Sequence, residues 1–211
     1  DHPMTRLLEG DVGSGKTLVA ATSAYAIIRN RPLDKKKGVK QTFGTLQVAY
    51  MAPTEILATQ LFENVIAYFR GTGIQIGLIT GSGCRKFPTK VASAREPWTT
   101  ISRPQLLKWV KNGEIPILIG THALIQKSVE FKDLALVVID EQHRFGTAQR
   151  AKLARKTGHA PHLLSMTATP IPRTLALTIY GDLDLSIVDE MPAGRKKVIT
   201  EIIAPDKRAG A

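Results

Sequence analysis

Short apolar runs alternate with segments of helical period along most of the chain. The runs are nearly continuous in hydrophobicity rather than alternating, which is typical of parallel strands covered by helices on both faces. Strands separated by helical segments predict a doubly wound α/β sheet, mostly parallel, with helices on both faces. The six predicted strands cover residues 5–10, 46–52, 74–80, 115–121, 134–140 and 162–168.

The segment 54–71 carries the clearest helical pattern. Thr54 can cap its amino end and Gly71 can end it. Further helices are predicted over 18–30 and over 102–113, the latter between Ser102 and Gly113. The apolar stripe of the helix predicted over 54–71 repeats every four residues at Leu57, Leu61, Val65 and Phe69, with Ala58, Phe62 and Ile66 beside it.

Two basic stretches, 30–44 and 81–98, interrupt this alternation. Both contain Gly or Pro and several Lys or Arg, and both are poorer in apolar residues than their flanks. They are predicted to be exposed loops or insertions. Either they are solvated segments without a partner or they contact nucleic acid, and the sequence leaves both alternatives open.

The length and charge of the chain narrow its class. The 211 residues suit one domain, and 43% of them are hydrophobic, which is enough for a sizeable core. The formal net charge of +11 favours a polyanionic partner, with nucleic acid first, over charge kept only for solubility. No apolar run is long enough to cross a bilayer, and Cys84 is the only cysteine. A cytoplasmic protein without a membrane partner is therefore expected.

The segment "GDVGSGKT" fits the pattern G-x-x-x-x-G-K-[ST] in full. It follows a predicted strand and opens a predicted helix, where backbone N–H groups and the helix dipole favour phosphate oxygens. Lys16 can reach the outer phosphates of a nucleoside triphosphate, and the Thr17 hydroxyl can hold Mg²⁺. The predicted phosphate-binding residues are Gly10, Asp11, Val12, Gly13, Ser14, Gly15, Lys16 and Thr17.

Two adjacent carboxylates end the buried strand over 134–140. Asp140 and Glu141 are costly to place at a strand end unless a cation meets them. The carboxyl ends of parallel strands share one edge of the sheet, so Thr17 and Asp140 can approach one metal ion. ATP with Mg²⁺ supplies that cation. Glu141 is then placed to orient or deprotonate the water that attacks the γ-phosphate, with Lys16 and Asp140 as the other catalytic residues.

Four further segments resemble the motifs of the superfamily 2 DExH helicases. In their sequences and their order along the chain, together with the segment "MTATPIPRTLALTIYGDLDLSIVDEMPAGRKK", they are most similar to the RecG group of branched-DNA helicases. They also share several features with the transcription-repair coupling translocases. The resemblance implies a RecA-like P-loop NTPase fold. The four segments are "APTEILATQ" (52–60), "GTHALIQ" (120–126), "DEQH" (140–143) and "SMTATP" (165–170).

This resemblance implies further site residues. One set of residues would couple the state of the nucleotide to the strength of DNA binding. A second set would line the path of the bound DNA strand. Contacts of the second kind, through backbone and phosphate, suit a motor that moves over any sequence. The coupling set is Gln142, His143, Ser165 and Thr167, and the DNA-path set is Thr54, Gly120, Thr121 and His122.

The resemblance also implies a domain organisation. Residues 1–198 are expected to form the first RecA-like lobe, and 199–211 the linker or the start of a second lobe. The second lobe and the wedge domain typical of RecG helicases are expected as partners, with branched or forked DNA. The isolated lobe is expected to hydrolyse ATP slowly, because an arginine finger from the second lobe is worth about 10³–10⁵ in rate.

Two other classes remain open from the sequence. A P-loop ATPase that moves no nucleic acid shares the nucleotide motifs, but it gives no reason for the segments at 52–60, 120–126 and 165–170. A binding lobe that has lost its ATPase activity is opposed by intact Lys16, Asp140 and Glu141. Fork remodelling and transcription-coupled translocation use the same kind of lobe.

Overall fold

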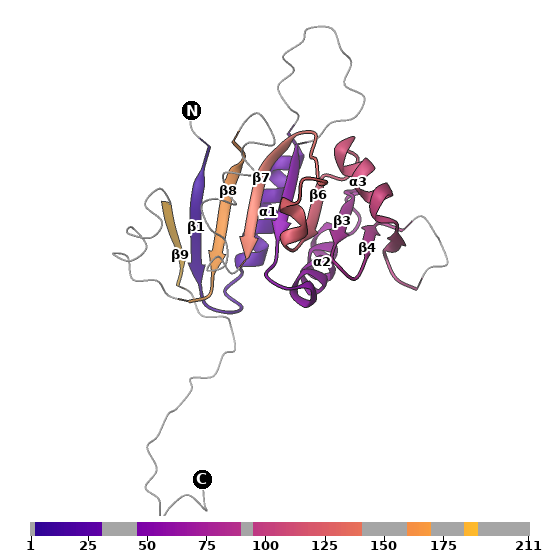
Figure 1. Ribbon diagram of the computed structural model, residues 1–211. Helices are drawn as coiled ribbons and strands as arrows, with labels where there is room; N and C mark the ends of the chain where they lie inside the picture. Colours follow the sequence, from indigo (N-terminus) through magenta and orange to yellow (C-terminus); the bar gives the residue numbers. More distant parts are fainter. Residues whose placement is uncertain (1–2, 31–45, 90–94, 141–159, 170–183, 190–211) are drawn as a thin grey trace, which may run out of the picture.

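The computed structural model describes residues 3–30, 46–89, 95–140, 160–169 and 184–189 (Figure 1). These residues form one nine-stranded sheet in the order β5-β4-β3-β6-β2-β7-β8-β1-β9. The predicted α/β fold is confirmed. The strands are β1 (Thr5–Gly10), β2 (Gln47–Met51), β3 (Ile76–Ile79), β4 (Cys84–Phe87), β5 (Thr99–Ile101), β6 (Ile117–Gly120), β7 (Leu134–Asp140), β8 (His162–Thr167) and β9 (Asp184–Val188).

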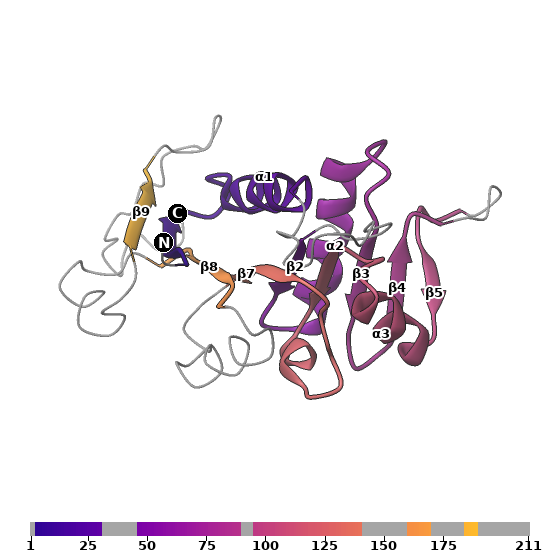
Figure 2. The ribbon, with the colours of Figure 1, turned by 90° about the horizontal axis from the view of Figure 1, so that it is seen from above.

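Helices cover both faces of this sheet. Helices α1 (Lys16–Ile28) and α2 (Glu55–Phe69) lie on one face, and α3 (Arg103–Lys111) lies on the other, as Figure 2 shows. The short 3₁₀ helix η1 (His122–Ile125) follows β6 directly. Each face has its own hydrophobic core, with Phe62 of α2 in the first and Leu106 of α3 in the second. All six strands predicted from the apolar runs are present, and all six are parallel to their neighbours among these six.

Helix α2 begins and ends where its sequence predicts. The Thr54 hydroxyl accepts a hydrogen bond from the Leu57 backbone N–H at 3.3 Å, and Gly71, just after the helix, has a positive φ of 81°. The predicted apolar stripe is wrong at Leu57, whose exposed fraction is 42%. Ala58, in the same first turn, is fully buried, so the buried face of α2 begins at Ala58 and leaves Leu57 at its exposed side. No described helix combines the length and apolarity that a membrane span requires.

The predicted loop over 81–98 is wrong for residues 84–87. These residues form β4, which pairs antiparallel with β3 on one side and with β5 on the other. The strand escaped the hydrophobic pattern because two of its four residues are Arg85 and Lys86. Their charges lie over tryptophan rings, with Arg85 4.2 Å from the Trp98 centroid and Lys86 5.6 Å from that of Trp109. The basic stretch 30–44 falls almost entirely outside the described residues.

Strand β9 was not predicted either. Its sequence "DLSIV" is short and half polar, as suits a strand at the edge of a sheet. It pairs parallel with β1, and Arg6 of β1 donates a hydrogen bond to the Ser186 hydroxyl at 2.8 Å. The strand that leads into the predicted phosphate-binding segment therefore has a paired neighbour on each side.

Glu55, the first residue of α2, ties this helix to the turn between β3 and β4. Its carboxylate accepts hydrogen bonds from the backbone N–H of Gly81 at 2.6 Å and of Ser82 at 3.3 Å. The Gly81 bond, followed by the Ser82 side chain, lowers the pKa of Glu55 below its ordinary value of 4.5.

A pH-dependent contribution to stability follows from this tie. A depressed carboxyl pKa stabilises the folded state above the unfolded value, and the contribution is lost as the pH falls through the folded value. We expect Glu55→Gln to lower the free energy of unfolding near neutral pH and to have progressively less effect below about pH 4.5. Urea unfolding of both proteins across this range measures the difference. An equal difference at neutral and acidic pH would contradict the assignment.

Candidate nucleotide-binding site

The segment from Gly10 to Thr17 that is predicted to bind phosphate (the phosphate loop) forms a tight loop between β1 and α1. Gly13 and Gly15 have φ angles of 83° and 94°, which only glycine adopts at little cost. The Ser14 N–H donates to the Asp11 carbonyl at 3.1 Å, and the N–H groups of Leu18 and Val19 donate to the Gly15 carbonyl. The loop therefore ends at the amino terminus of a 13-residue helix, where free N–H groups and the dipole favour an anion.

The Lys16 ammonium lies folded over this loop. Its Nζ donates hydrogen bonds to the carbonyl oxygens of Gly10 at 2.7 Å and Asp11 at 2.8 Å, and the side chain is partly buried. These carbonyls hold the positive charge at the mouth of the loop. Phosphate oxygens that enter the loop would meet it there.

Thr17 and Asp140 line the same cavity. It has a volume of about 330 Å³, within the range of small-ligand sites. The carboxylate comes from the end of β7 and the hydroxyl from the first turn of α1, as the strand arrangement predicts. The cavity is lined by Val12, Gly13, Gly15, Lys16, Thr17, Leu18, Tyr68, Asp140 and Ala168.

These residues fit a magnesium ion that arrives with a nucleotide. One hydroxyl and one carboxylate suit Mg²⁺, which keeps several waters and takes further oxygens from phosphate. A group of three or more metal-ligating His, Cys, Asp or Glu residues is absent from the described part of the chain. A metal ion held mainly by phosphate and water needs no such group. Glu141, Gln142 and His143, predicted for water activation and coupling, lie outside the described residues.

The other two coupling candidates lie in β8, between the strands of the phosphate loop and of Asp140. Ser165 is fully buried, and its hydroxyl makes no hydrogen bond within the described part of the structure. The Thr167 hydroxyl lies 2.9 Å from that of Thr169 and accepts a hydrogen bond from the Thr169 N–H at 3.2 Å. Thr167 therefore shapes the turn after β8, whereas Ser165 keeps an unused polar group.

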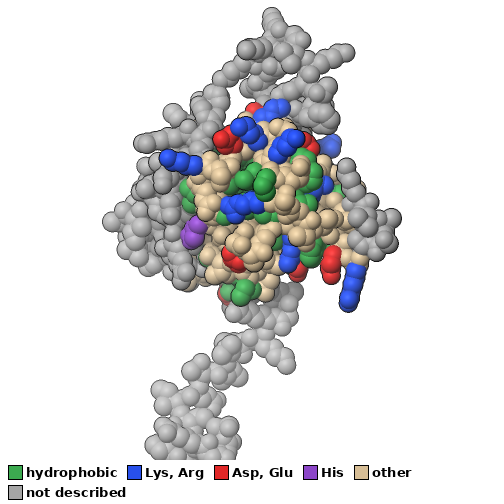
Figure 3. All heavy atoms as spheres, turned by 45° about the vertical axis from the view of Figure 1, so that its right-hand side comes forward, with side chains coloured by type: hydrophobic (Ala, Val, Ile, Leu, Met, Phe, Trp, Pro, Cys, Tyr) green, Lys and Arg blue, Asp and Glu red, His purple; other side chains and the backbone are tan. Residues whose placement is uncertain are grey.

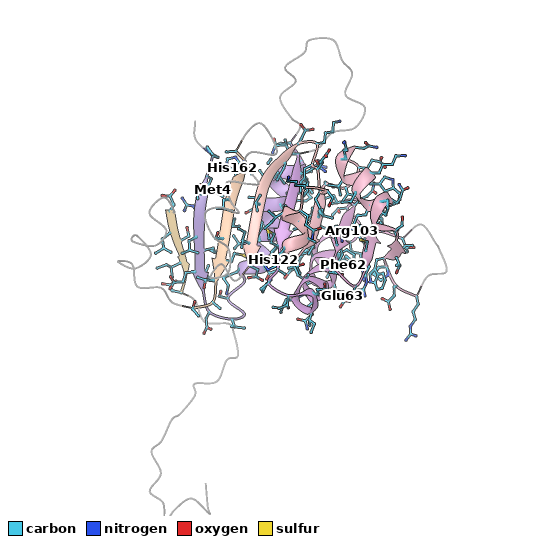
Figure 4. The ribbon with its side chains drawn as sticks, viewed as in Figure 1. Met4, Phe62, Glu63, Arg103, His122 and His162 are labelled. Carbon is cyan, nitrogen blue, oxygen red and sulfur yellow. The ribbon has the colours of Figure 1, made fainter. Side chains whose placement is uncertain are left out.

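The four predicted DNA-path residues come together at the carboxyl ends of β2 and β6, which are neighbours in the sheet. Thr54 caps α2, and Thr121 and His122 open η1. Figure 4 shows His122 near the edge of the sheet opposite to His162. Both Thr54 and His122 are exposed, and Thr121 is partly buried. A strand lying along this edge would meet all three.

Gly120 is buried and serves packing between strands. Its carbonyl accepts a hydrogen bond from the Ala52 N–H at 2.9 Å. A Cβ atom at this position would lie 2.6 Å from the Ile79 carbonyl oxygen and 2.8 Å from Ile79 Cγ2. The close approach of β6 and β3 therefore explains why glycine is needed at position 120. Its contact with DNA stays a prediction.

Two tyrosines near the cavity were not predicted. Tyr68 lines it from α2, and the buried Tyr50 lies in β2. Tyr50 is hidden within an apolar run, and Tyr68 continues a helical pattern, so neither position carries a sequence signal for a site. Tyr68 reaches the cavity because α2 packs over the sheet, and Tyr50 lies close to it because β2 is the neighbour of β7.

Comparison with known proteins decides the family. A model of the DEAD/DEAH box helicases matches residues 4–178, most of the chain. The chain belongs to the DEAD/DEAH box helicase family. This helicase domain has the RecA-like architecture that its motifs predict. The family match covers the phosphate loop, the strand that ends in Asp140, and β8.

Relatives of this helicase domain include several RecG proteins. It is 47% identical over 212 residues to the ATP-dependent DNA helicase RecG of Haemophilus influenzae, covering 99% of this chain and 26% of that protein. The RecG of Bacillus subtilis is also 47% identical, with 97% and 26% covered. The resemblance to RecG helicases is confirmed. The chain spans about a quarter of the length of these curated relatives.

Solved structures of helicases share the fold. A structure of RecG bound to a three-way DNA junction matches with a TM-score of 0.71 and 38% identity, covering 97% of this chain and 23% of that one. The Mycobacterium smegmatis helicase Lhr, bound to single-stranded DNA and AMP-PNP, matches with a TM-score of 0.55 over 89% of this chain and 24% of its own. At 19% identity the second likeness shows the fold alone.

Proposed function

We propose that this domain is the ATP-hydrolysing motor lobe of a DNA helicase that remodels branched DNA in recombination and repair. The observation that carries the proposal is that Lys16, Thr17 and Asp140 line one and the same cavity. Hydrolysis of a nucleoside triphosphate requires a loop that binds the phosphates, and a hydroxyl and a carboxylate that hold Mg²⁺. The P-loop, Thr17 and Asp140 bring these groups to one cavity.

The residues of the site divide the chemistry among them. The loop from Gly10 to Gly15 binds phosphate oxygens through its backbone, and Lys16 leaves its carbonyl partners to bind the outer phosphates. Thr17 and Asp140 would hold Mg²⁺. When bound, the metal neutralises charge that develops on the phosphates. Glu141, next along the chain from Asp140, orients the attacking water and accepts its proton.

The edge of the sheet supports the DNA part of the proposal. Thr54, Thr121 and His122 lie together at the carboxyl ends of β2 and β6, the same edge that carries the nucleotide residues. The chain carries a net charge of +11, and Figure 3 shows Lys and Arg side chains distributed over one face, with Asp and Glu between them. Positive side chains and hydroxyl groups of this kind contact the phosphates of DNA rather than the edges of its bases.

The specific substrate rests on the relatives. RecG in a solved complex is bound to a three-way DNA junction, and this chain matches about a quarter of that protein. We infer that the complete protein adds a second RecA-like lobe and a wedge domain, and that it acts on forks and four-way junctions in the cytoplasm. The second lobe closes the cavity and supplies an arginine finger, worth about 10³–10⁵ in rate.

ATP hydrolysis by the complete protein tests this function. We expect a synthetic four-way junction to stimulate turnover well above linear duplex DNA at equal nucleotide concentration. Glu141→Gln should abolish turnover in both cases while junction binding remains, because the lost group acts on water and not on DNA. Equal stimulation by both DNAs would favour transcription-coupled translocation. An ATP hydrolysis rate that does not change when DNA is added would favour an ATPase that does not act on nucleic acid. An unchanged hydrolysis rate in Glu141→Gln would overturn the catalytic role of Glu141.

A further inference from the structure

Tyr50 buries a phenol hydroxyl that makes no hydrogen bond of normal geometry with the residues that the structure describes. The residue is 1% exposed, in the middle of β2, and its Oη atom is shielded from solvent. The Thr17 hydroxyl is close enough to lower its pKa, but it makes no hydrogen bond of normal geometry with it. Burying such a hydroxyl without a partner destabilises a folded protein. Phenylalanine would fill the same space without that cost. The hydroxyl therefore calls for an explanation beyond packing.

The position of Tyr50 in the sheet directs it towards the nucleotide site. Tyr50 is paired with Val138 of β7, and both side chains belong to the core beneath α1 and α2. Asp140 follows two residues later on the same strand, so its side chain leaves the same face of the sheet, one step closer to the carboxyl edge. Thr17 stands above this face in the first turn of α1.

The electrostatic surroundings of the phenol agree with this placement. Burial, followed by the negative charge of Asp140, raises the pKa of Tyr50, and the Thr17 hydroxyl acts in the opposite direction. Tyr68 makes a smaller contribution that also raises it. All three neighbours line the nucleotide cavity. A tyrosine side chain carries one O–H group that can donate a hydrogen bond.

We propose that the Tyr50 hydroxyl is a positioning group for the divalent metal, donating a hydrogen bond to the Asp140 carboxylate when Mg²⁺ and nucleotide are bound. The inference rests on the proposed nucleotide site and adds a residue to it. Partners of this kind orient a metal-binding carboxylate from behind, and their loss typically weakens metal affinity about 10- to 100-fold. Tyr50 contacts neither nucleotide nor metal in this arrangement. It acts through Asp140.

The Mg²⁺ dependence of nucleotide binding tests this role in the complete protein. A fluorescent ATP analogue is titrated in EDTA and at increasing Mg²⁺, for the parent and for Tyr50→Phe. We expect equal affinity in EDTA, because the phenol does not contact phosphate. We expect the Mg²⁺ concentration at half-effect to rise about tenfold or more in the variant. Tyr25→Phe is the matched control, since it removes the hydroxyl of a tyrosine that is 42% exposed on α1.

Three results separate the possibilities. An unchanged Mg²⁺ requirement in Tyr50→Phe, with the same or a higher melting temperature, would overturn the inference. The hydroxyl would then be a buried polar group that only destabilises the fold. Equal weakening in EDTA and in Mg²⁺ would also overturn it, because the effect would then not pass through the metal. If the parent itself binds the analogue without regard to Mg²⁺, the proposed nucleotide site fails, and the two failures are distinguished by the parent alone.

Discussion

Replacement of Lys16 by alanine is expected to weaken the binding of Mg²⁺-ATP roughly 10- to 100-fold, the loss that one or two charge-assisted hydrogen bonds produce. The ammonium is already positioned at the loop by the carbonyls of Gly10 and Asp11, at 2.7 and 2.8 Å. Little rearrangement is then needed for it to exchange those carbonyls for phosphate oxygens. Equilibrium titration with a fluorescent nucleotide measures the loss directly, without depending on turnover.

The matched control is Lys111→Ala. Lys111 lies at the end of α3, 66% exposed, in a surface ion pair of 2.6 Å with Glu130. It removes the same charge from the other face of the sheet, and exposed pairs contribute little to stability. Nucleotide affinity should not change. Equal weakening in both variants would mean that net charge, rather than the loop geometry, governs binding. Full affinity in Lys16→Ala would remove Lys16 from the site.

Replacement of Gly120 by alanine is expected to lower the free energy of unfolding by about 2–3 kcal/mol, the upper part of the range for overpacked interiors. The added methyl group would meet the Ile79 carbonyl oxygen at 2.6 Å. That oxygen belongs to the neighbouring strand, so relief requires β3 and β6 to separate. Because Thr121 and His122 follow directly, the same shift would disturb the DNA-path residues.

Urea unfolding of the chain measures this loss, with Gly77→Ala as the control. A Cβ atom at Gly77 would meet the terminal methyl groups of Leu106 at 2.9 Å and Leu118 at 3.0 Å, within the same part of the sheet. Side-chain ends can move more easily than a backbone carbonyl, so we expect the smaller loss there. A Gly120→Ala protein as stable as its parent would show that the strands separate at negligible cost.

The hydrophobic pattern predicted the centre of the sheet but not its margins. Buried parallel strands are apolar on both faces, so six of them were visible in the sequence. Strand β4 was missed because Lys86 is buried against Trp109, and a charge paired with an aromatic ring is read from sequence as a loop residue. Strand β9 was missed because an edge strand needs only one apolar face.

The meeting of the loop residues and Asp140 at one cavity was predicted, for a different reason, and the binding of nucleotide there stays a prediction. The loop from Gly10 to Thr17 is contiguous, so its geometry is encoded locally, and the rule that parallel strands end at one edge was sufficient to bring Asp140 to it. Tyr50 and Tyr68 reach the site only through tertiary packing. A tyrosine in an apolar strand has the same local signature whether its hydroxyl is idle or directed at a ligand. That the Tyr50 hydroxyl makes no hydrogen bond of normal geometry among the described residues became visible only in three dimensions.

The pairing of β9 with β1 has a consequence for anyone who shortens this protein. Without residues 184–188, the strand that feeds the phosphate loop would become the border of the sheet, with its outward N–H and C=O groups unpaired. Exposed borders of this kind recruit strands from other molecules. A version trimmed before Asp184 would keep every residue of the nucleotide cavity and still be prone to self-association beside it.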